Sequence, residues 1–284
     1  MVSQKVKQTL EKALGEAGSL LKRAAKKPLQ IKYKGPVSIV TQVDKAAEKL
    51  IIGIIHKQFP DHSILAEESA FASGTGSGRD RFCSASPKKN LSRNRTGTVS
   101  SSKWIIDPID GTSNFAHRLP MACVSIAYEE NGIVEVGGVW NPFLGEWFWA
   151  ERGKGASLNG KKIRVSKIKT LKDSMLVTGF PYDRRKRARY YLNFMQAFIM
   201  KTQGIRRMGS AAIDTCYVAC GRFDGYWEFK LNAWDVAAAA LIAQEAGATL
   251  TDFSGKRMSI YGNQTLVSNG AIHNQMLRVI KKCI

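Results

Sequence analysis

The sequence has little of several features that would indicate particular classes of protein. Its five cysteines form no C-x-x-C pair and its four histidines show no ligand spacing, so neither a disulfide framework nor a zinc site is indicated. The longest purely apolar run, Val236 to Ala243, has eight residues, whereas a membrane span needs about 20. The N-terminus lacks an apolar run of signal-peptide type and carries Glu11 and Glu16. These absences predict a cytoplasmic protein without a membrane span.

Acidic residues are also scarce relative to basic ones. There are 23 Asp and Glu against 43 Lys and Arg, which gives a net charge of +20. Such a surface attracts phosphorylated metabolites, nucleic acids and anionic lipids. Basic clusters at 184–187 and 206–207 leave weak nucleic-acid binding, or binding of an acidic partner, as one interpretation. A solvated basic surface without a dedicated partner is the other.

The length and the periodicity predict two domains, 1–150 and 151–284. Apolar spacing predicts helices over 6–21 and 43–55, with Thr41 and Asp44 forming a capping box before the second. Strands are expected at 63–66, 104–106, 121–128, 133–139 and 146–150, so the first domain is α+β with a mainly antiparallel sheet. Alternating strands (174–179, 225–229) and helices (184–198, 211–219, 236–246) predict a smaller α/β domain after it. Asn159-Gly160 is typical of a hairpin turn.

Residues 70–103 interrupt this pattern. Of these 34 residues, 15 are Gly, Ser or Thr, seven are basic and one is acidic. This composition predicts a flexible basic insertion. Gating of a neighbouring pocket, recruitment of a polyanionic substrate, no function, and a reading-frame error in the gene sequence are the interpretations that remain open.

Carboxylates gather where predicted strands end. The run from Asp107 to Thr112 reads Asp-Pro-Ile-Asp-Gly-Thr and leaves a strand abruptly. Pro108 holds Asp107 extended, and Gly111 lets the backbone turn. Two carboxylates and a carbonyl can then converge, and hard oxygen donors of this kind suit Mg²⁺. The amides of Gly111 and Thr112 would begin a helix that can face phosphate. An ordinary Asp-Gly turn is the alternative.

Other acids give weaker individual signals. Glu67 and Glu68 end a strand and can simply be solvated, while Asp44 and Asp235 can be helix caps. If these side chains converge, their like charges repel, and divalent cations are the natural remedy. The hypothesis therefore requires Asp235 to lie close to Asp107 and Glu67.

Several segments in order resemble the inositol monophosphatase family. Residues 104–115 (Trp-Ile-Ile-Asp-Pro-Ile-Asp-Gly-Thr-Ser-Asn-Phe) are similar to its signature, and 234–240 (Trp-Asp-Val-Ala-Ala-Ala-Ala) to its second signature. Ala-Glu-Glu-Ser at 66–69, the 153–160 segment and Gly-Ser-Ala-Ala at 209–212 also match. The resemblance covers nearly the whole chain except 70–103. It implies a layered αβαβα sandwich of the sugar-phosphatase type, two subdomains with mixed sheets, a homodimer, and Mg²⁺-dependent, lithium-sensitive hydrolysis of phosphomonoesters.

The same resemblance implies a role for each matching residue. Two or three Mg²⁺ ions are expected, the first held by Glu67, Asp107 and the Ile109 carbonyl, the second by Asp107, Asp110 and Asp235. Catalytic positions that orient the attacking water are Glu67 and Thr112, with Asp44 and Glu68 as acidic supports. Substrate positions are Asp110, Gly111, Thr112, Gly209, Ala211, Glu228 and Asp235.

The substrate is expected to be a small phosphorylated metabolite. Inositol 1-phosphate is the first choice because Glu228 and the 209–212 segment match that branch. Fructose 1,6-bisphosphate, 3′-phosphoadenosine 5′-phosphate and histidinol phosphate are the alternatives, since relatives share the metal residues. Two departures from the family pattern are the long insertion and Ser38, where an Asp is common.

Overall fold

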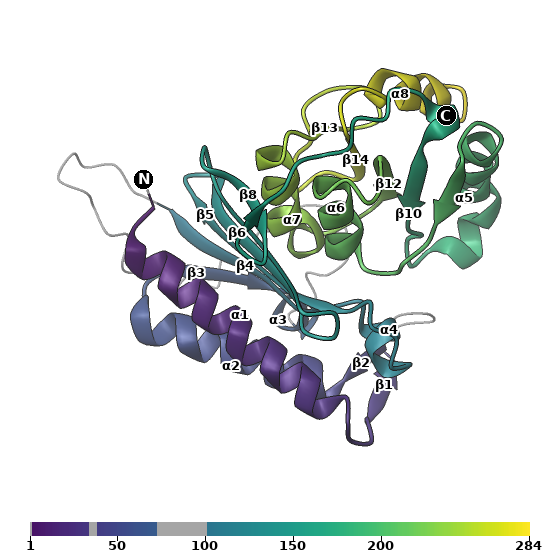
Figure 1. The fold of residues 1–284 in the computed structure, drawn as a ribbon. Coiled ribbons are helices and arrows are strands. Elements are labelled where there is room, and N and C mark those ends of the chain that lie inside the picture. The colour runs from purple at the N-terminus through teal and green to yellow at the C-terminus, as the bar shows by residue number, and fades with distance from the viewer. Residues whose placement is uncertain (1, 34–38, 73–100) are drawn as a thin grey trace.

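The computed structural model describes residues 2–33, 39–72 and 101–284. Figure 1 shows the arrangement of helices and sheets in these residues. The expectations for Ser38 and for residues 73–100 of the basic insertion lie outside the described residues.

Two long helices form the first layer. α1 (Gln4–Ala24) and α2 (Gln42–Gln58) lie side by side on one face of a large sheet (Figure 1). The predicted apolar stripe of α1 is buried, whereas on α2 Ala46 is exposed and Leu50 and Ile54 are only partly buried. Both helices belong to one core cluster with the sheet. The predicted capping box is confirmed, because the Asp44 carboxylate accepts the Thr41 backbone N–H at 2.8 Å. The start of α2 is therefore fixed by its own sequence.

The second layer is a seven-stranded sheet with its strands in chain order from β3 to β9. Only the β3–β4 pair is parallel among these neighbours, so the sheet is mainly antiparallel, as predicted. The strands are β3 (Ser63–Ala66), β4 (Ser102–Asp110), β5 (Cys123–Glu130), β6 (Ile133–Asn141), β7 (Glu146–Glu151), β8 (Gly155–Leu158) and β9 (Lys161–Lys162).

The middle layer consists of α6 (Ala211–Ala219) and α7 (Ala233–Glu245). Every residue of α6 is buried, and α7 is buried on nearly all sides. Helices that are apolar all round belong in an interior. Their side chains share one core cluster with Phe148 of the large sheet and Tyr226 of a second sheet, so the two halves of the chain have a common core.

The second sheet has five strands in the order β11-β10-β12-β14-β13. It is mixed, since β10 pairs in parallel with β11 and β12 while β14 pairs antiparallel with β12 and β13. Its strands are β10 (Met175–Thr178), β11 (Gly204–Arg206), β12 (Gly225–Phe229), β13 (Thr249–Thr251) and β14 (Gln264–Ser268). The outer face packs against α5 (Arg184–Ile199) and α8 (His273–Lys281).

The layers run helix, sheet, helix, sheet, helix, which confirms the expected αβαβα sandwich. Short elements complete it: β1 (Ile31–Tyr33) and β2 (Ile39–Thr41) form a ribbon, and three single turns are α3 (Glu67–Ala72), α4 (Thr112–Ala116) and η1 (Leu171–Asp173). No helix of the described ranges is both long and apolar enough to cross a membrane.

Some local expectations need correction. β4 does not end before Asp107 but continues to Asp110, with an irregular register against β5 between these two residues. α7 begins at Ala233 rather than Val236. The predicted turn at Asn159-Gly160 is confirmed, since it joins β8 to β9 with positive φ at both residues. The large sheet extends to Lys162, so its last strands lie past residue 150, and the division into two domains stays a prediction.

Candidate metal and active site

Carboxylates from separate elements meet at one end of the large sheet. Asp107 and Asp110 come from the end of β4, and Asp235 comes from the first turn of α7. One oxygen from each lies within 4.8 Å of the others. The expected convergence of Asp235 with Asp107 is therefore confirmed, although the two residues are far apart in the chain.

Asp107 occupies the irregular end of β4. Its Oδ1 accepts the Ile109 backbone N–H at 3.0 Å, which holds the carboxylate beside its own turn. The side chain is 2% exposed. Burial raises the pKa of Asp107 well above its usual value, and the charges of Glu67, Asp110, Asp235 and Asp44 raise it further. Asp107 is thus at the centre of a group of mutually repelling carboxylates.

Asp110 is held by the N-terminus of α6. Its Oδ2 accepts the Ser210 hydroxyl at 2.6 Å and the Ala212 backbone N–H at 2.7 Å. Burial raises the pKa of Asp110, and these hydrogen bonds oppose the rise by stabilising the anion. A residue of the first sheet is therefore fixed by a helix of the middle layer.

Asp235 is the third residue of α7 rather than its N-cap. Asn232 is the cap, and its backbone N–H donates to Asp235 Oδ2 at 2.6 Å in a second capping box. Burial and the charges of Asp110 and Glu67 raise the pKa of Asp235 well above its usual value. The capping box fixes the position of the Asp235 carboxylate beside the cluster.

Glu67 and Glu68 begin the short helix α3, directly after β3. The Glu48 carboxylate on α2 holds this start, because it accepts the backbone N–H groups of Glu68 at 2.7 Å and Ser69 at 3.0 Å, together with the Ser69 hydroxyl. Glu67 and Glu68 are each 8% exposed. The Glu67 carboxylate lies close enough for its charge to raise the pKa of both Asp107 and Asp235.

A second set of contacts, which is partly buried, starts from the α2 capping box. Thr112 Oγ1 lies 2.9 Å from Asp44 Oδ1 and 2.9 Å from the Ile109 carbonyl oxygen. Asp44 itself is fully buried. Asp44 therefore caps α2 and also positions the Thr112 hydroxyl, which combines the two interpretations of this residue.

Gly111 turns the chain between β4 and α4. Its φ is +90°, and a Cβ placed there would be 2.6 Å from the Met121 carbonyl oxygen. Both the left-handed backbone and the close approach require glycine. Gly209 likewise has a φ of +91° and precedes the N-cap of α6.

Among the predicted substrate residues, Glu228 belongs to the second sheet, whereas Asp110 ends β4 and Asp235 lies in α7. Glu228 is on β12, is 8% exposed, and accepts the Tyr226 hydroxyl at 2.6 Å on Oε2. Burial raises the pKa of Glu228 to about 7, while the Tyr226 hydrogen bond and the Arg207 charge oppose the rise. Ala211 opens α6 and is buried.

Two residues that support the cluster were not predicted. Glu48 lies one turn beyond Asp44 on the buried side of α2, and an acid on a core-facing stripe is the signal that could have identified it. Ser210 lies inside the matching 209–212 segment without a predicted role of its own. Its hydroxyl bonds Asp110 and also caps α6 by accepting the Ile213 N–H.

Comparison with known proteins identifies the family to which this αβαβα sandwich with its acidic cluster belongs. The model of the inositol monophosphatase family matches residues 3–284. This chain belongs to the inositol monophosphatase family.

Individual relatives have different names. The chain is 37% identical to "Nus factor SuhB" of Pseudomonas aeruginosa, covering 95% of this chain and 93% of that protein. It is 42% identical to "Inositol-1-monophosphatase" of Synechocystis, covering 88% and 80%. The solved structure of the extragenic suppressor protein suhB from Bartonella henselae superposes with a TM-score of 0.83 at 34% identity, covering 98% and 99%.

Proposed function

We propose that this protein is a Mg²⁺-dependent phosphomonoesterase and that inositol 1-phosphate is its substrate. The observation that carries the proposal is the convergence of Asp107, Asp110 and Asp235 within 4.8 Å. Family membership and the inositol monophosphatase of Synechocystis support the reaction class.

The residues fit divalent magnesium. The donors are carboxylate oxygens, which Mg²⁺ prefers to nitrogen or sulfur. Buried carboxylates with raised pKa values repel one another, and a cation removes that repulsion. We assign a first ion to Glu67, Asp107 and the Ile109 carbonyl, and a second to Asp107, Asp110 and Asp235. A third ion stays an expectation from the resemblance.

Bound Mg²⁺ would supply a water of lowered pKa and neutralise charge on the phosphoryl group and the leaving oxygen. The chain's own residues orient the reactants. Thr112 donates to Asp44, so its oxygen can accept a hydrogen bond from the attacking water. Glu67 is the second acceptor for this water, and Glu68 and Asp44 are the acidic supports. The backbone amides of Gly111 and Thr112 are assigned to the phosphate.

A separate set of residues is assigned to the alcohol part of the substrate, apart from those assigned to the water and the phosphate. Asp235, Gly209, Ala211 and Glu228 are the proposed contacts for the alcohol part of the substrate, with Glu228 accepting hydrogen bonds from its hydroxyls. Competing substrates are fructose 1,6-bisphosphate, 3′-phosphoadenosine 5′-phosphate and histidinol phosphate. The first is supported by "Fructose-1,6-bisphosphatase/inositol-1-monophosphatase" of Thermotoga maritima, which is 38% identical.

The experiment is phosphate release from each of these four substrates during a Mg²⁺ titration, with and without lithium. The proposal expects hydrolysis that depends on Mg²⁺, is inhibited by lithium, and has its highest kcat/KM for inositol 1-phosphate. A higher kcat/KM for another member of the panel would overturn the substrate assignment. Absence of metal-dependent hydrolysis on all four would overturn the enzyme assignment.

A second candidate role is binding of nucleic acid or an acidic protein through the basic surface. The name "Nus factor SuhB", carried by a 37% identical relative, favours it alongside the net charge of +20. Wild-type RNA binding that falls steeply with salt, and is retained by Asp107→Asn, would support this role independently of catalysis. Homodimer formation and a cytoplasmic location stay predictions of the resemblance and the composition.

A further inference from the structure

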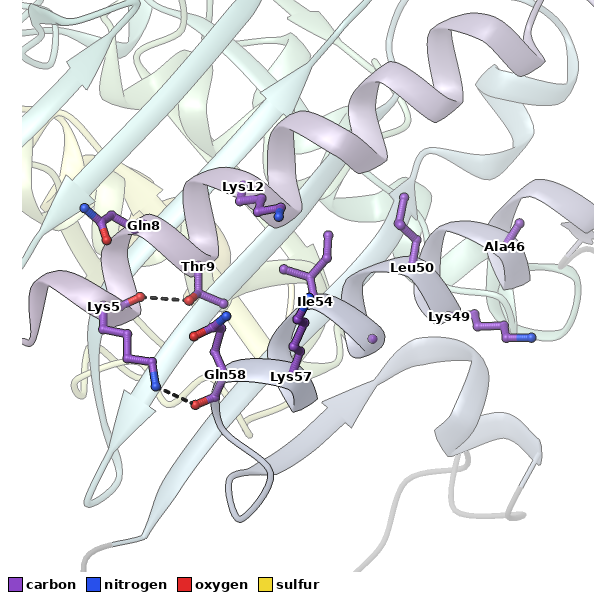
Figure 2. Close-up of a pocket in the computed structure, with 11 residues that line it drawn as sticks. Lys5, Gln8, Thr9, Lys12, Ala46, Lys49, Leu50, Ile54, Lys57 and Gln58 are labelled. Atoms are coloured by element: carbon purple, nitrogen blue, oxygen red, sulfur yellow. Dashed lines mark hydrogen bonds between the residues drawn. The ribbon is translucent and has the colours of Figure 1, made fainter.

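The first helical layer contains a groove between α1 and α2, beside their buried stripes. The groove has a volume of about 660 Å³ and lies between the two helices. Figure 2 shows its lining side chains. They are Lys5, Gln8, Thr9 and Lys12 from α1, and Ala46, Lys49, Leu50, Gly53, Ile54, Lys57 and Gln58 from α2.

The lining residues recur at helical spacing on both helices. On α2 the sequence positions 46, 49–50, 53–54 and 57–58 form one stripe, and on α1 positions 5, 8–9 and 12 form another. Residues spaced by three or four lie on the same face of a helix. Two such stripes facing one groove are the surface against which a third helix packs, because its side-chain ridges can enter between them.

The groove has an apolar floor and a basic rim. Leu50 and Ile54, one turn apart, are only partly buried, and a Cβ added to Gly53 between them would have no atom within 4 Å. Four lysines line the groove and no acidic residue does. Lys5 donates to the Gln58 carbonyl oxygen at 2.9 Å, and Lys12 lies 3.7 Å from Glu16. Lys49 and Lys57 form no ion pair with any residue in the described ranges.

We infer that this groove binds an acidic amphipathic helix of a partner protein. In the bound state the apolar residues of the partner helix lie on Leu50 and Ile54, and the carboxylates of the partner helix face Lys49 and Lys57. The span from Ala46 to Gln58 is about 18 Å at 1.5 Å per residue, which corresponds to about three turns of a bound helix. Proteins that bind single-stranded RNA stack its bases on aromatic side chains. The lining of this groove contains no aromatic side chain. Charge complementarity and the apolar floor therefore favour a protein helix.

The test uses the full-length protein and two fluorescent peptides of the same acidic composition. One places leucines at helical i, i+3/i+4, i+7 spacing with glutamates beside them, and the other has the order scrambled. Binding is followed by fluorescence anisotropy. The amphipathic peptide is expected to bind at least about tenfold more tightly than the scrambled one, because only it can bury a leucine stripe.

Variants locate the binding. Gly53→Leu fills the groove, and the open space around Gly53 lets the fold accept it, so affinity for the amphipathic peptide is expected to fall about tenfold or more. His56→Leu adds the same side chain at an exposed position of α2 outside the lining and is expected to change nothing. Lys49→Glu weakens binding, whereas Lys45→Glu, outside the lining, weakens it much less.

Three results would overturn the inference. One is equal binding of the two peptides, which would mean attraction by charge alone. Another is a Gly53→Leu variant that keeps wild-type affinity while its phosphatase activity and melting curve show it folded. The last is tighter binding of an oligouridylate of about 20 nucleotides than of the peptide, lost in Lys49→Glu, which would make the groove a phosphate-backbone site.

Discussion

The carboxylate of Asp110 at the end of β4 accepts a 2.6 Å hydrogen bond from the hydroxyl of Ser210, the N-cap of α6. This contact joins residues 100 positions apart and links the first sheet to the middle helical layer. The same Oδ2 also accepts the Ala212 N–H. Because Asp110 is an assigned metal ligand, the orientation of that ligand depends on how the two halves of the chain pack.

Ser210→Ala should therefore lower both stability and activity. It removes a helix cap and a hydrogen bond to a buried carboxylate, which together cost about 1–3 kcal/mol of unfolding free energy. Loss of a residue that orients a metal ligand should also weaken apparent Mg²⁺ affinity about 10- to 100-fold. Denaturant unfolding and Mg²⁺ titrations of activity measure the two effects. Ser210→Thr keeps the hydroxyl and should recover most of the Mg²⁺ affinity, and an equal loss in both variants would contradict this role.

Glu48→Gln tests the support of α3. Both Glu48 oxygens accept N–H donors from the start of α3, and an amide would turn an NH₂ group toward one of them. Glu67 would then be less well placed, so the Mg²⁺ concentration for half-maximal activity should rise about tenfold or more. Glu11→Gln, at an exposed position of α1, is the matched control and should behave as wild type. An unchanged Mg²⁺ requirement in Glu48→Gln would show that Glu67 is positioned without it.

Asp107→Asn tests the assignment of the shared metal ligand. The variant keeps an oxygen for the Ile109 N–H but loses the charge that both proposed ions share. Metal charge stabilisation is worth several kcal/mol, so kcat should fall about 10³-fold or more. Circular dichroism should show an unchanged fold. Near-normal Mg²⁺-dependent turnover would refute the metal assignment.

The same variant should stabilise the metal-free protein. The raised pKa of Asp107 means that the folded state binds this proton more tightly than the unfolded state does. Proton binding by Asp107 therefore stabilises the fold fully below the ordinary carboxyl pKa. This contribution is lost as the pH rises through the raised pKa of the folded state. Removing the charge should therefore increase Tm in EDTA by about 2–4 °C for each kcal/mol of charge repulsion that the substitution removes.

The difference in Tm between Asp107→Asn and wild type should depend on pH and on Mg²⁺. It should be small near pH 4 and grow toward neutral pH, where the wild-type cluster becomes charged. Added Mg²⁺ should raise the Tm of wild type more than that of Asp107→Asn, since ligand binding stabilises the folded state. Scanning calorimetry with EDTA or Mg²⁺ across this range is the measurement. A variant less stable than wild type in EDTA at every pH would show that charge repulsion is not the dominant effect.

Much of the fold and the acidic cluster could be predicted because the signals are local. Apolar periodicity predicts α1 and α2, and the capping box at Thr41 and Asp44 needs only four consecutive residues. The short strands β11 and β13 carry no such signal, since three residues form a strand only when a neighbouring strand pairs with them. α8 was not predicted, although its amphipathic pattern is clear in the sequence.

Contacts between distant segments were predictable only in part. Convergence of Asp235 with Asp107 was expected because both matched a family motif and like charges need a shared cation. Nothing in the local sequence places Ser210 against Asp110 or Glu48 against α3, because these contacts depend on packing between layers. The near-uniform apolarity of α6 and α7 indicates burial but does not say which two sheets enclose them.

Glu228 gives a prediction about substrate binding and pH. Its pKa is raised to about 7, so near neutral pH a large fraction of the carboxyl is protonated in the free protein. Only the ionised carboxyl offers both oxygens as acceptors, and Tyr226 already donates to one of them. If Glu228 accepts from substrate hydroxyls, kcat/KM should rise with pH through about 7, because kcat/KM follows ionisations of the free enzyme.

Glu228→Gln should remove this dependence. The amide is similar in size and has one acceptor oxygen at all pH values, so kcat/KM for inositol 1-phosphate should be lower but nearly flat from about pH 6 to 8. A loss of about tenfold or more at high pH, concentrated in KM, is expected for a missing charged hydrogen bond of about 1.5–3 kcal/mol. Hydrolysis of p-nitrophenyl phosphate, which has no hydroxyls to bind, is the control and should change little. If the variant keeps the wild-type pH profile on inositol 1-phosphate, the titrating group lies elsewhere and Glu228 does not bind the substrate hydroxyls.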